Sequence, residues 1–157
     1  MSRVEPLAGQ LGAKHLFDCN VGDPASIDRT FAEIERIWGK IDFVIHSIAY
    51  AERQYLEHDS FHKTSREAFQ QALDISAYSL IGMAQRAKTL MTDGGSIVAM
   101  TYYGGEKVVP GYNVMGVAKA ALEHSTRYLA ADLGEKGVRV NTVSGGPLKT
   151  AAAMAVG

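Results

Sequence analysis

Four short apolar runs alternate along the chain with segments of helical periodicity. The runs have the length of β-strands and lie at residues 14–21, 41–49, 94–103 and 137–146. Between them, apolar residues recur at helical spacing over residues 24–38, 65–91 and 112–134. Strands that alternate with helices in this way form a parallel sheet through right-handed crossovers. The sequence therefore predicts an α/β fold.

Two of the expected helices carry signals at their ends. Asp23 and Pro24 suit the N-cap and the first position of the first helix, and Gly39 follows its last residue. Thr64 and Glu67 have the spacing of a capping box, which predicts the start of the second helix. These signals agree with the boundaries that the periodicity indicates.

Composition argues against several classes of protein. The 157 residues, 46% of them apolar, are enough for one compact domain, which we expect to span 1–157. Because 16 Lys and Arg balance 17 Asp and Glu, no net electrostatic field favours binding to nucleic acid or to an anionic membrane.

No apolar run reaches the ~20 residues of a membrane span. Cys19 is the one cysteine, so an intrachain disulfide is excluded and we expect a cytoplasmic protein. A metal site is not predicted, since His58 and His62 lie in a polar loop without a clear third ligand.

Two tyrosines and a lysine stand close together in "TYYGGEKVVPGYNVMGVAK", at positions 102, 112 and 119. In a helix, seven residues rotate through ~700° and rise ~10.5 Å, so Tyr112 and Lys119 would project from the same face. A nearby ammonium lowers the pKa of a phenol, and such a pair suits a reaction that develops negative charge on a carbonyl oxygen. The spacing alone is a weak pattern, and by itself it favours a core tyrosine and a surface lysine.

Three predicted strands end in small residues, at "SIAYA" (47–51), "TYYGG" (101–105) and "SGGPLKT" (144–150). In parallel α/β sheets, ligands bind beyond the carboxyl ends of the strands. The three strand exits and the Tyr112–Lys119 helix are therefore expected to surround one cleft.

These same segments resemble the bacterial enoyl-[acyl-carrier-protein] reductases, which are divergent members of the short-chain dehydrogenase/reductase superfamily. The likeness is carried by "HSIAYA", "DISAYSL", "TYYGGEKVVPGYNVMGVAKAALE", "RYLAADLG" and "GVRVNTVSGGPLKTAAA". Ordinary members of the superfamily have Asn-Asn-Ala-Gly in place of "HSIA", and a Ser before Tyr-x3-Lys in place of two tyrosines and Tyr-x6-Lys. The resemblance implies a Rossmann-like, doubly wound parallel sheet and reduction of trans-2-enoyl thioesters in type II fatty-acid synthesis.

The resemblance also implies a role for individual residues. Tyr112 would donate a hydrogen bond to the thioester carbonyl, Lys119 would hold the nicotinamide ribose hydroxyls, and Tyr102 would be the second active-site tyrosine. The substrate would also meet Ala51 and Met115. The cofactor would be NADH, with NADPH not excluded, and its remaining contacts would be Asn20, Val21, Ser47, Ile48, Ala49, Leu148, Lys149 and Thr150. The family has Asp at the position of Asn20, whose amide oxygen can still accept a hydrogen bond.

The glycine-rich turn that opens a dinucleotide-binding unit is absent from this sequence. The resemblance runs from about Arg3 to Ala153 and implies a fold that is truncated relative to the family, beginning within its second helix. The strands that would separate residues 14–21 from 41–49 are then missing. Strand 14–21 could move beside 41–49 or pair with a second chain, and the sequence does not choose between these arrangements.

Two other functions remain open on the sequence alone. A related short-chain carbonyl reductase would use Tyr112 to protonate an alkoxide, and an inactive fragment of the reductase fold would survive by assembly or act as a binding module. We expect a homo-oligomer, a dimer or tetramer, because the helices over 65–91 and 112–134 carry apolar residues in more than one direction. The resemblance implies a homotetramer.

Overall fold

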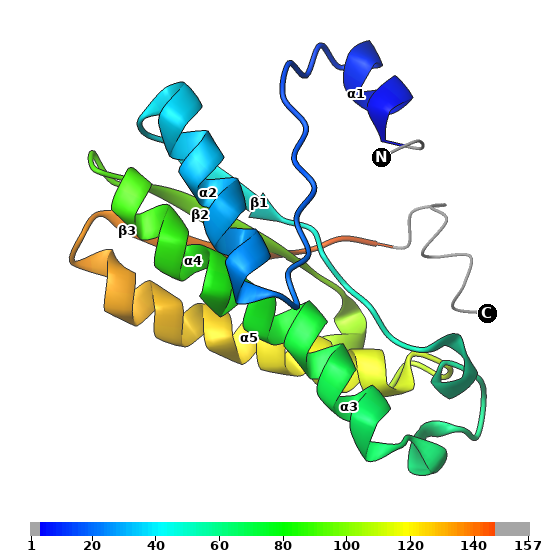
Figure 1. Ribbon diagram of the computed structural model, residues 1–157. Coiled ribbons are helices and arrows are strands. Elements are labelled where there is room, and N and C mark those ends of the chain that lie inside the picture. The colour runs from blue at the N-terminus through cyan, green and yellow to red at the C-terminus, as the bar shows by residue number, and fades with distance from the viewer. Residues whose placement is uncertain (1–3, 147–157) are drawn as a thin grey trace.

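The computed structural model describes residues 4–146, and its centre is a parallel sheet of three strands (Figure 1). The strand order is β1 (Phe43–His46), β2 (Gly95–Thr101) and β3 (Val138–Ser144). Val44 lies opposite Ile97, and Ile97 lies opposite Val140, so one row of apolar side chains crosses the sheet. The predicted α/β class and three of the four predicted strands are confirmed, each strand being shorter than its apolar run.

The helices form between the strands, as the periodicity predicts. They are α1 (Glu5–Gln10), α2 (Pro24–Trp38), α3 (Arg66–Leu73), α4 (Ser79–Leu90) and α5 (Asn113–Gly134). Shorter helical turns are η1 (Arg53–Tyr55), η2 (Phe61–Lys63), η3 (Asp74–Tyr78) and η4 (Tyr103–Gly105). The turn η3 is π-helical and separates α3 from α4 within the single helix expected over 65–91. Because a π-helical turn holds one residue more than an α-helical turn, α3 and α4 present different faces from those of one continuous helix.

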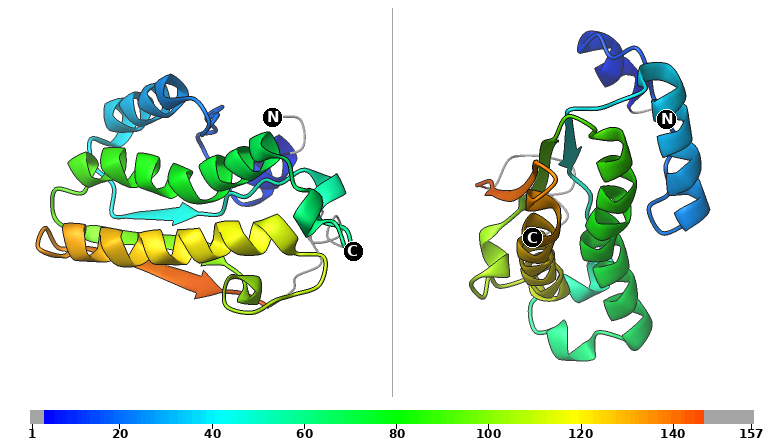
Figure 2. Two further views of the ribbon diagram at one scale, coloured as in Figure 1. Left: turned by 90° about the horizontal axis from the view of Figure 1, so that it is seen from below. Right: turned by 90° about the vertical axis from the view of Figure 1, so that its left-hand side faces the viewer.

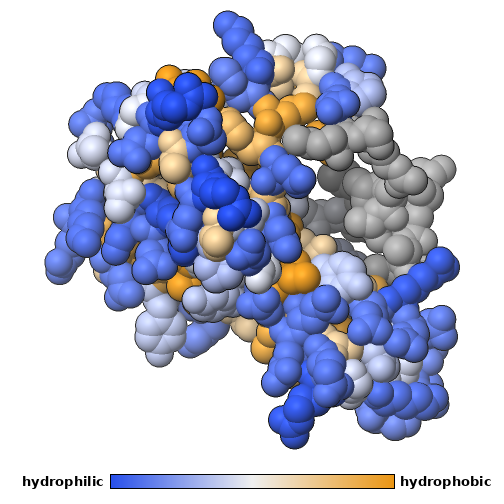
Figure 3. Space-filling view, in the orientation of Figure 1, coloured by the Kyte–Doolittle hydropathy of each residue, from blue (hydrophilic) through white to orange (hydrophobic). Residues whose placement is uncertain are grey.

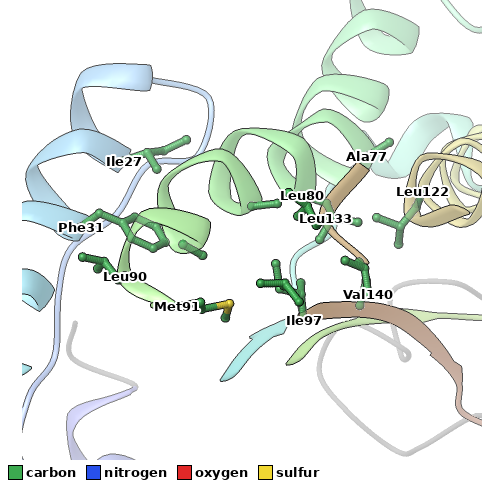
Figure 4. Packing of buried hydrophobic residues seen from close by; sticks show 14 residues of the cluster. Ile27, Phe31, Ala77, Leu80, Leu90, Met91, Ile97, Leu122, Leu133 and Val140 are labelled. Carbon is green, nitrogen blue, oxygen red and sulfur yellow. The ribbon is translucent and has the colours of Figure 1, made fainter. Parts of the chain in front are cut away.

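The core lies between the sheet and the helices α4 and α5, which pack side by side, with α2 on the outer side of α4 (Figure 2). Its centre is formed by fully buried Leu80, Ile97 and Leu122, one each from α4, β2 and α5 (Figure 4). Each such side chain stabilises the fold by roughly 1.5–3 kcal/mol relative to its exposed state. This packing holds α5 against β2 and β3.

The strand predicted at 14–21 is wrong. Residues 13–20 form an extended segment without strand pairing, which runs beside α2 (Figure 1). Cys19 and Val21 pack against the core, and a hollow lined partly by Leu16, Phe17 and Trp38 lies between the segment and its neighbours. A strand requires a hydrogen-bonded neighbour, and in residues 4–146 this segment has apolar contacts instead.

The predicted capping box at Thr64 and Glu67 is also wrong. Ser65 is the N-cap of α3, and its hydroxyl accepts a hydrogen bond from the Ala68 amide at 3.1 Å. The Thr64 hydroxyl instead donates to the Phe61 carbonyl at 2.7 Å and closes η2. Asp23 is the N-cap of α2 as predicted, accepting from the Ala25 amide at 3.0 Å.

The sheet face opposite the helices is partly open. Phe43 and Ile45 of β1 are 66% and 60% exposed, and Val143 of β3 is 48% exposed. Apolar side chains also reach the surface between the polar residues of the helical side (Figure 3). In residues 4–146 no helix is long and apolar enough to cross a membrane.

Candidate active site

Lys119 is buried in the first half of α5, with 6% of its surface exposed. Its ammonium donates a hydrogen bond of 2.7 Å to the carbonyl of Met100, the second-last residue of β2. An ammonium has three donors, so this bond leaves two for a ligand. Burial lowers the pKa of Lys119, and the nearby carboxylate of Glu123 opposes that effect. The interaction anchors the charge at the carboxyl end of the central strand.

The rings of Tyr102 and Tyr112 are in contact. Their ring centroids lie 4.9 Å apart with an interplanar angle of 68°, the edge-to-face arrangement that aromatic rings prefer. Tyr102 follows β2 directly, whereas Tyr112 is the residue before α5. Gly104 lies against the Tyr112 ring so closely that a Cβ at this position would overlap ring atom Cδ1. The loop and the helix therefore fix the tyrosine pair jointly.

The predicted fall in the pKa of Tyr112 is wrong. Burial and, to a lesser extent, Tyr102 raise the pKa of Tyr112 to about 12. The charge of Lys119 acts on His46 instead, whose pKa it helps to lower. At neutral pH the Tyr112 phenol is therefore protonated and serves as a hydrogen-bond donor.

His46 ends β1 and is completely buried. The Ser79 hydroxyl donates to the Ile75 carbonyl at 2.6 Å, so it accepts from His46 Nε2–H at 2.7 Å. His46 Nδ1 is buried without a hydrogen-bond partner among the described residues. Burial, reinforced by Lys119, lowers the pKa of His46 to about 4, so the imidazole is neutral at physiological pH. These two hydrogen bonds connect the end of β1, through Ser79, to Ile75 in the π-helical turn.

The predicted substrate residues Ala51, Tyr112 and Met115 share one apolar cluster centred on Leu56, Ala72, Val114 and Ala118. Met115 is buried, and Ala51 and Tyr112 are half-buried. The structure thus joins the loop after β1 to the start of α5. The pocket beside Tyr112 includes Gly104, Val108 and Gly116, with a volume of about 360 Å³.

The predicted cofactor residues lie in two places. Ser47, Ile48 and Ala49 follow β1 at the same end of the sheet as Tyr102. Asn20 and Val21 precede α2, and the Asn20 side-chain oxygen accepts from the Gly22 amide at 3.1 Å in a local turn. Leu148, Lys149 and Thr150 lie outside the described residues.

The sequence profile of the family described as enoyl-(acyl carrier protein) reductase matches residues 1–157. The chain belongs to this family. Among the curated relatives, enoyl-[acyl-carrier-protein] reductase [NADH] 1 of Rhizobium meliloti (strain 1021) is 56% identical over 99% of this chain. The chain spans 57% of that relative's length.

Two solved structures of enoyl reductases agree closely with this fold. The Anaplasma phagocytophilum enzyme, in complex with NAD, has a TM-score of 0.92 and 48% identity, over 96% of this chain and 57% of its own. The Bacillus cereus enzyme, with NADP+ and an indole naphthyridinone, has a TM-score of 0.91 and 45% identity. That match covers 98% of this chain and 60% of the other. The Rossmann-like parallel sheet expected from the family resemblance is thereby confirmed.

Several polar residues at this end of the sheet were not predicted from the sequence. Glu123 accepts a 2.6 Å hydrogen bond from Thr101 at the end of β2, and Ser76 bonds both backbone groups of Tyr50. Asn113 bonds the loop after β1. Small polar residues on the inner side of a helix, as in "DISAYS", are the signal that could have identified Ser76 and Ser79.

We predict that His46 makes the chain sensitive to acid. The folded-state pKa of His46 lies near 4, below the ordinary 6.5, so its contribution to stability is complete above about pH 6.5 and is lost as pH falls through about 4. From about pH 7 to about pH 4.5, the wild type should lose roughly 2 kcal/mol more stability than His46→Gln. Urea unfolding at both pH values measures this, with the exposed His58→Gln as control. Parallel pH dependence in wild type and His46→Gln would contradict the assignment.

Proposed function

We propose that this protein reduces trans-2-enoyl thioesters carried by acyl carrier protein, within type II fatty-acid synthesis. The observation that supports the proposal most directly is the Tyr102–Tyr112 contact next to buried Lys119 at the end of a parallel sheet. We infer a single, partial dinucleotide-binding and catalytic domain over residues 1–157. The names of the enoyl reductases that match this chain support the same reaction.

The residues present fit a nicotinamide cofactor. Lys119 keeps two donors for hydroxyl oxygens, and the small residues Ser47 and Ala49 follow β1 at the same end of the sheet. When bound, NADH supplies the hydride. NADPH is the open alternative, because the B. cereus structure contains NADP+. In this proposal Asn20 and Val21 contact the adenine, and Ile48 and residues 148–150 contact the rest of the cofactor.

Tyr112 acts on the substrate in this mechanism. Addition of hydride at C3 moves the double-bond electrons toward the thioester, so negative charge develops on the carbonyl oxygen. The protonated phenol of Tyr112 donates a hydrogen bond to that oxygen and stabilises the enolate. Tyr102 holds the Tyr112 ring and flanks the acyl chain, with Ala51 and Met115 beside it. Lys119 binds the ribose, and a proton from solvent adds at C2 of the enolate to complete the reduction.

The test is the turnover of crotonyl and acetoacetyl thioesters, followed as NADH consumption. We expect turnover of the crotonyl thioester, a loss of kcat of about 100-fold in Tyr112→Phe, and a raised KM for NADH in Lys119→Ala. Turnover of the ketone alone would favour the carbonyl-reductase alternative. Equal losses of cofactor affinity in both variants would contradict the separate roles of Tyr112 and Lys119.

Calorimetric titration with NADH separates the enzyme from an inactive fragment. Micromolar binding by the 157-residue chain is expected for the enzyme. A chain that folds and does not bind NADH would support the fragment alternative instead. The intact mass of the titrated protein shows that it is the 157-residue chain.

We further propose that the chain forms a dimer or tetramer. Tyr78 at the end of η3 and Tyr128 of α5 are 56% and 66% exposed, and the apolar side chain of Ile81 is also accessible on α4. A twofold axis beside α4 and α5 would bury these residues isologously. Light scattering behind size exclusion at micromolar concentration should give at least twice the mass of one chain. A monodisperse monomer would refute the proposal.

A further inference from the structure

The residue after Tyr112 has an unusual backbone conformation. Asn113 has φ = 44°, and Gly111, on the other side of Tyr112, has φ = 80°. Tyr112 itself has ordinary helical angles, φ −80° and ψ −30°. The direction of the Tyr112 side chain is therefore set by two flanking left-handed residues, one of which carries a side chain. Asparagine tolerates this conformation better than most residues, but it persists only where the surroundings stabilise it.

The side chain of Asn113 supplies that stabilisation. Its Nδ2 lies 2.9 Å from the Tyr55 carbonyl, 2.8 Å from the Glu57 carbonyl and 3.0 Å from Ser60 Oγ. Two of these partners are carbonyl oxygens, which only accept, so the amide nitrogen must face them. Ser60 Oγ donates to the Glu57 carbonyl at 2.6 Å and is therefore free to accept from Asn113. The two N–H donors of one amide group thus serve three oxygens of the loop over residues 55–60, one N–H being shared between two of them.

The bonded loop is part of the active-site cluster. Leu56 lies between the two carbonyls that Asn113 bonds, and it is buried against Val114, Met115 and Ala118 of α5. Ser60 is buried as well. The loop leads back to Ala51 and the exit of β1. Asn113 therefore joins the loop after β1 to the start of the helix that carries Lys119.

We propose that Asn113 is a positioning residue, which holds the Tyr112 ring against Tyr102 by bonding the 55–60 loop and thereby fixing the left-handed turn into α5. The inference rests on the proposed role of Tyr112, but the ring geometry that it concerns can be measured without turnover. The conformational and hydrogen-bonding parts of the role are separable. Glycine accepts φ = 44° without strain but has no side-chain amide. Aspartate keeps the shape of the side chain but presents acceptor oxygens to the two carbonyls.

The experiment is NMR of the 157-residue chain with labelled tyrosines, assigned with Tyr102→Phe and Tyr112→Phe. In the wild type we expect a ring-to-ring NOE between Tyr102 and Tyr112, and slow solvent exchange of the Asn113 side-chain amide. Asn113→Gly and Asn113→Asp should both lose the NOE while amide protons of β2 stay protected. The control Asn141→Asp changes an exposed asparagine of β3 and should keep the NOE.

Three outcomes would overturn the proposal. Free solvent exchange of the Asn113 side-chain amide in the wild type would show that the three bonds are not held in solution. An intact NOE in Asn113→Gly would show that the side chain is dispensable. Loss of the NOE in Asn141→Asp would show that the effect is not specific.

If the enoyl reductase activity is present, Asn113→Gly should lower kcat by at least about tenfold with little change in the KM for NADH. If the Asn113 variants lose the NOE and the wild type shows no activity, the positioning role is supported and the proposed function is contradicted.

Discussion

The site depends on the close approach of the η4 backbone to α5. A Cβ on Gly116 would lie 2.7 Å from the Gly104 carbonyl oxygen, and a Cβ on Gly105 would lie 2.6 Å from a Glu123 carboxylate oxygen. The Glu123 carboxylate is the end of a flexible side chain and can move aside, whereas the Gly104 carbonyl is backbone. The loop after β2 therefore reaches the helix chiefly because Gly116 has no side chain. The contact places Tyr102 beside Tyr112. It also brings the Met100 carbonyl within reach of Lys119.

Around this contact, the exits of β1 and β2 are tied to helices by buried or half-buried polar groups. His46 at the end of β1 bonds Ser79 of α4, Thr101 at the end of β2 bonds Glu123 of α5, and Asn113 bonds the loop between them. Hydrogen bonds in such surroundings are strong, and breaking one leaves an unsatisfied partner. The apolar core fixes the helices against the sheet, and these bonds fix where the loops lie. Their shared result is an end of the sheet at which the Tyr102–Tyr112 pair and the Lys119 ammonium are each held by defined contacts.

The sequence predicted the elements whose signal is local and failed where the outcome depends on a neighbour. The helix α2 was predicted, because Asp23 and Pro24 mark its start. The strand-exit rule assigned Tyr102 and Tyr112 to one region but did not predict the contact of their rings. The strand at 14–21 was not formed, since pairing depends on a second strand and not on the run itself. The pKa of Tyr112 was predicted in the wrong direction, because spacing shows the nearby lysine and does not show burial. No local pattern marked Asn113, whose partners are more than fifty positions away.

The most direct test compares alanine at two glycines of the same helix by urea unfolding. In an open helical position, glycine to alanine raises stability by up to about 1 kcal/mol. Gly134 has no atom within 4 Å of an added Cβ, so Gly134→Ala should be stabilising. Gly116→Ala should instead destabilise by about 1–3 kcal/mol, because the methyl group would push η4 away from α5. A stabilising Gly116→Ala, equal to Gly134→Ala, would contradict the claim that close approach of the two backbones holds the site together.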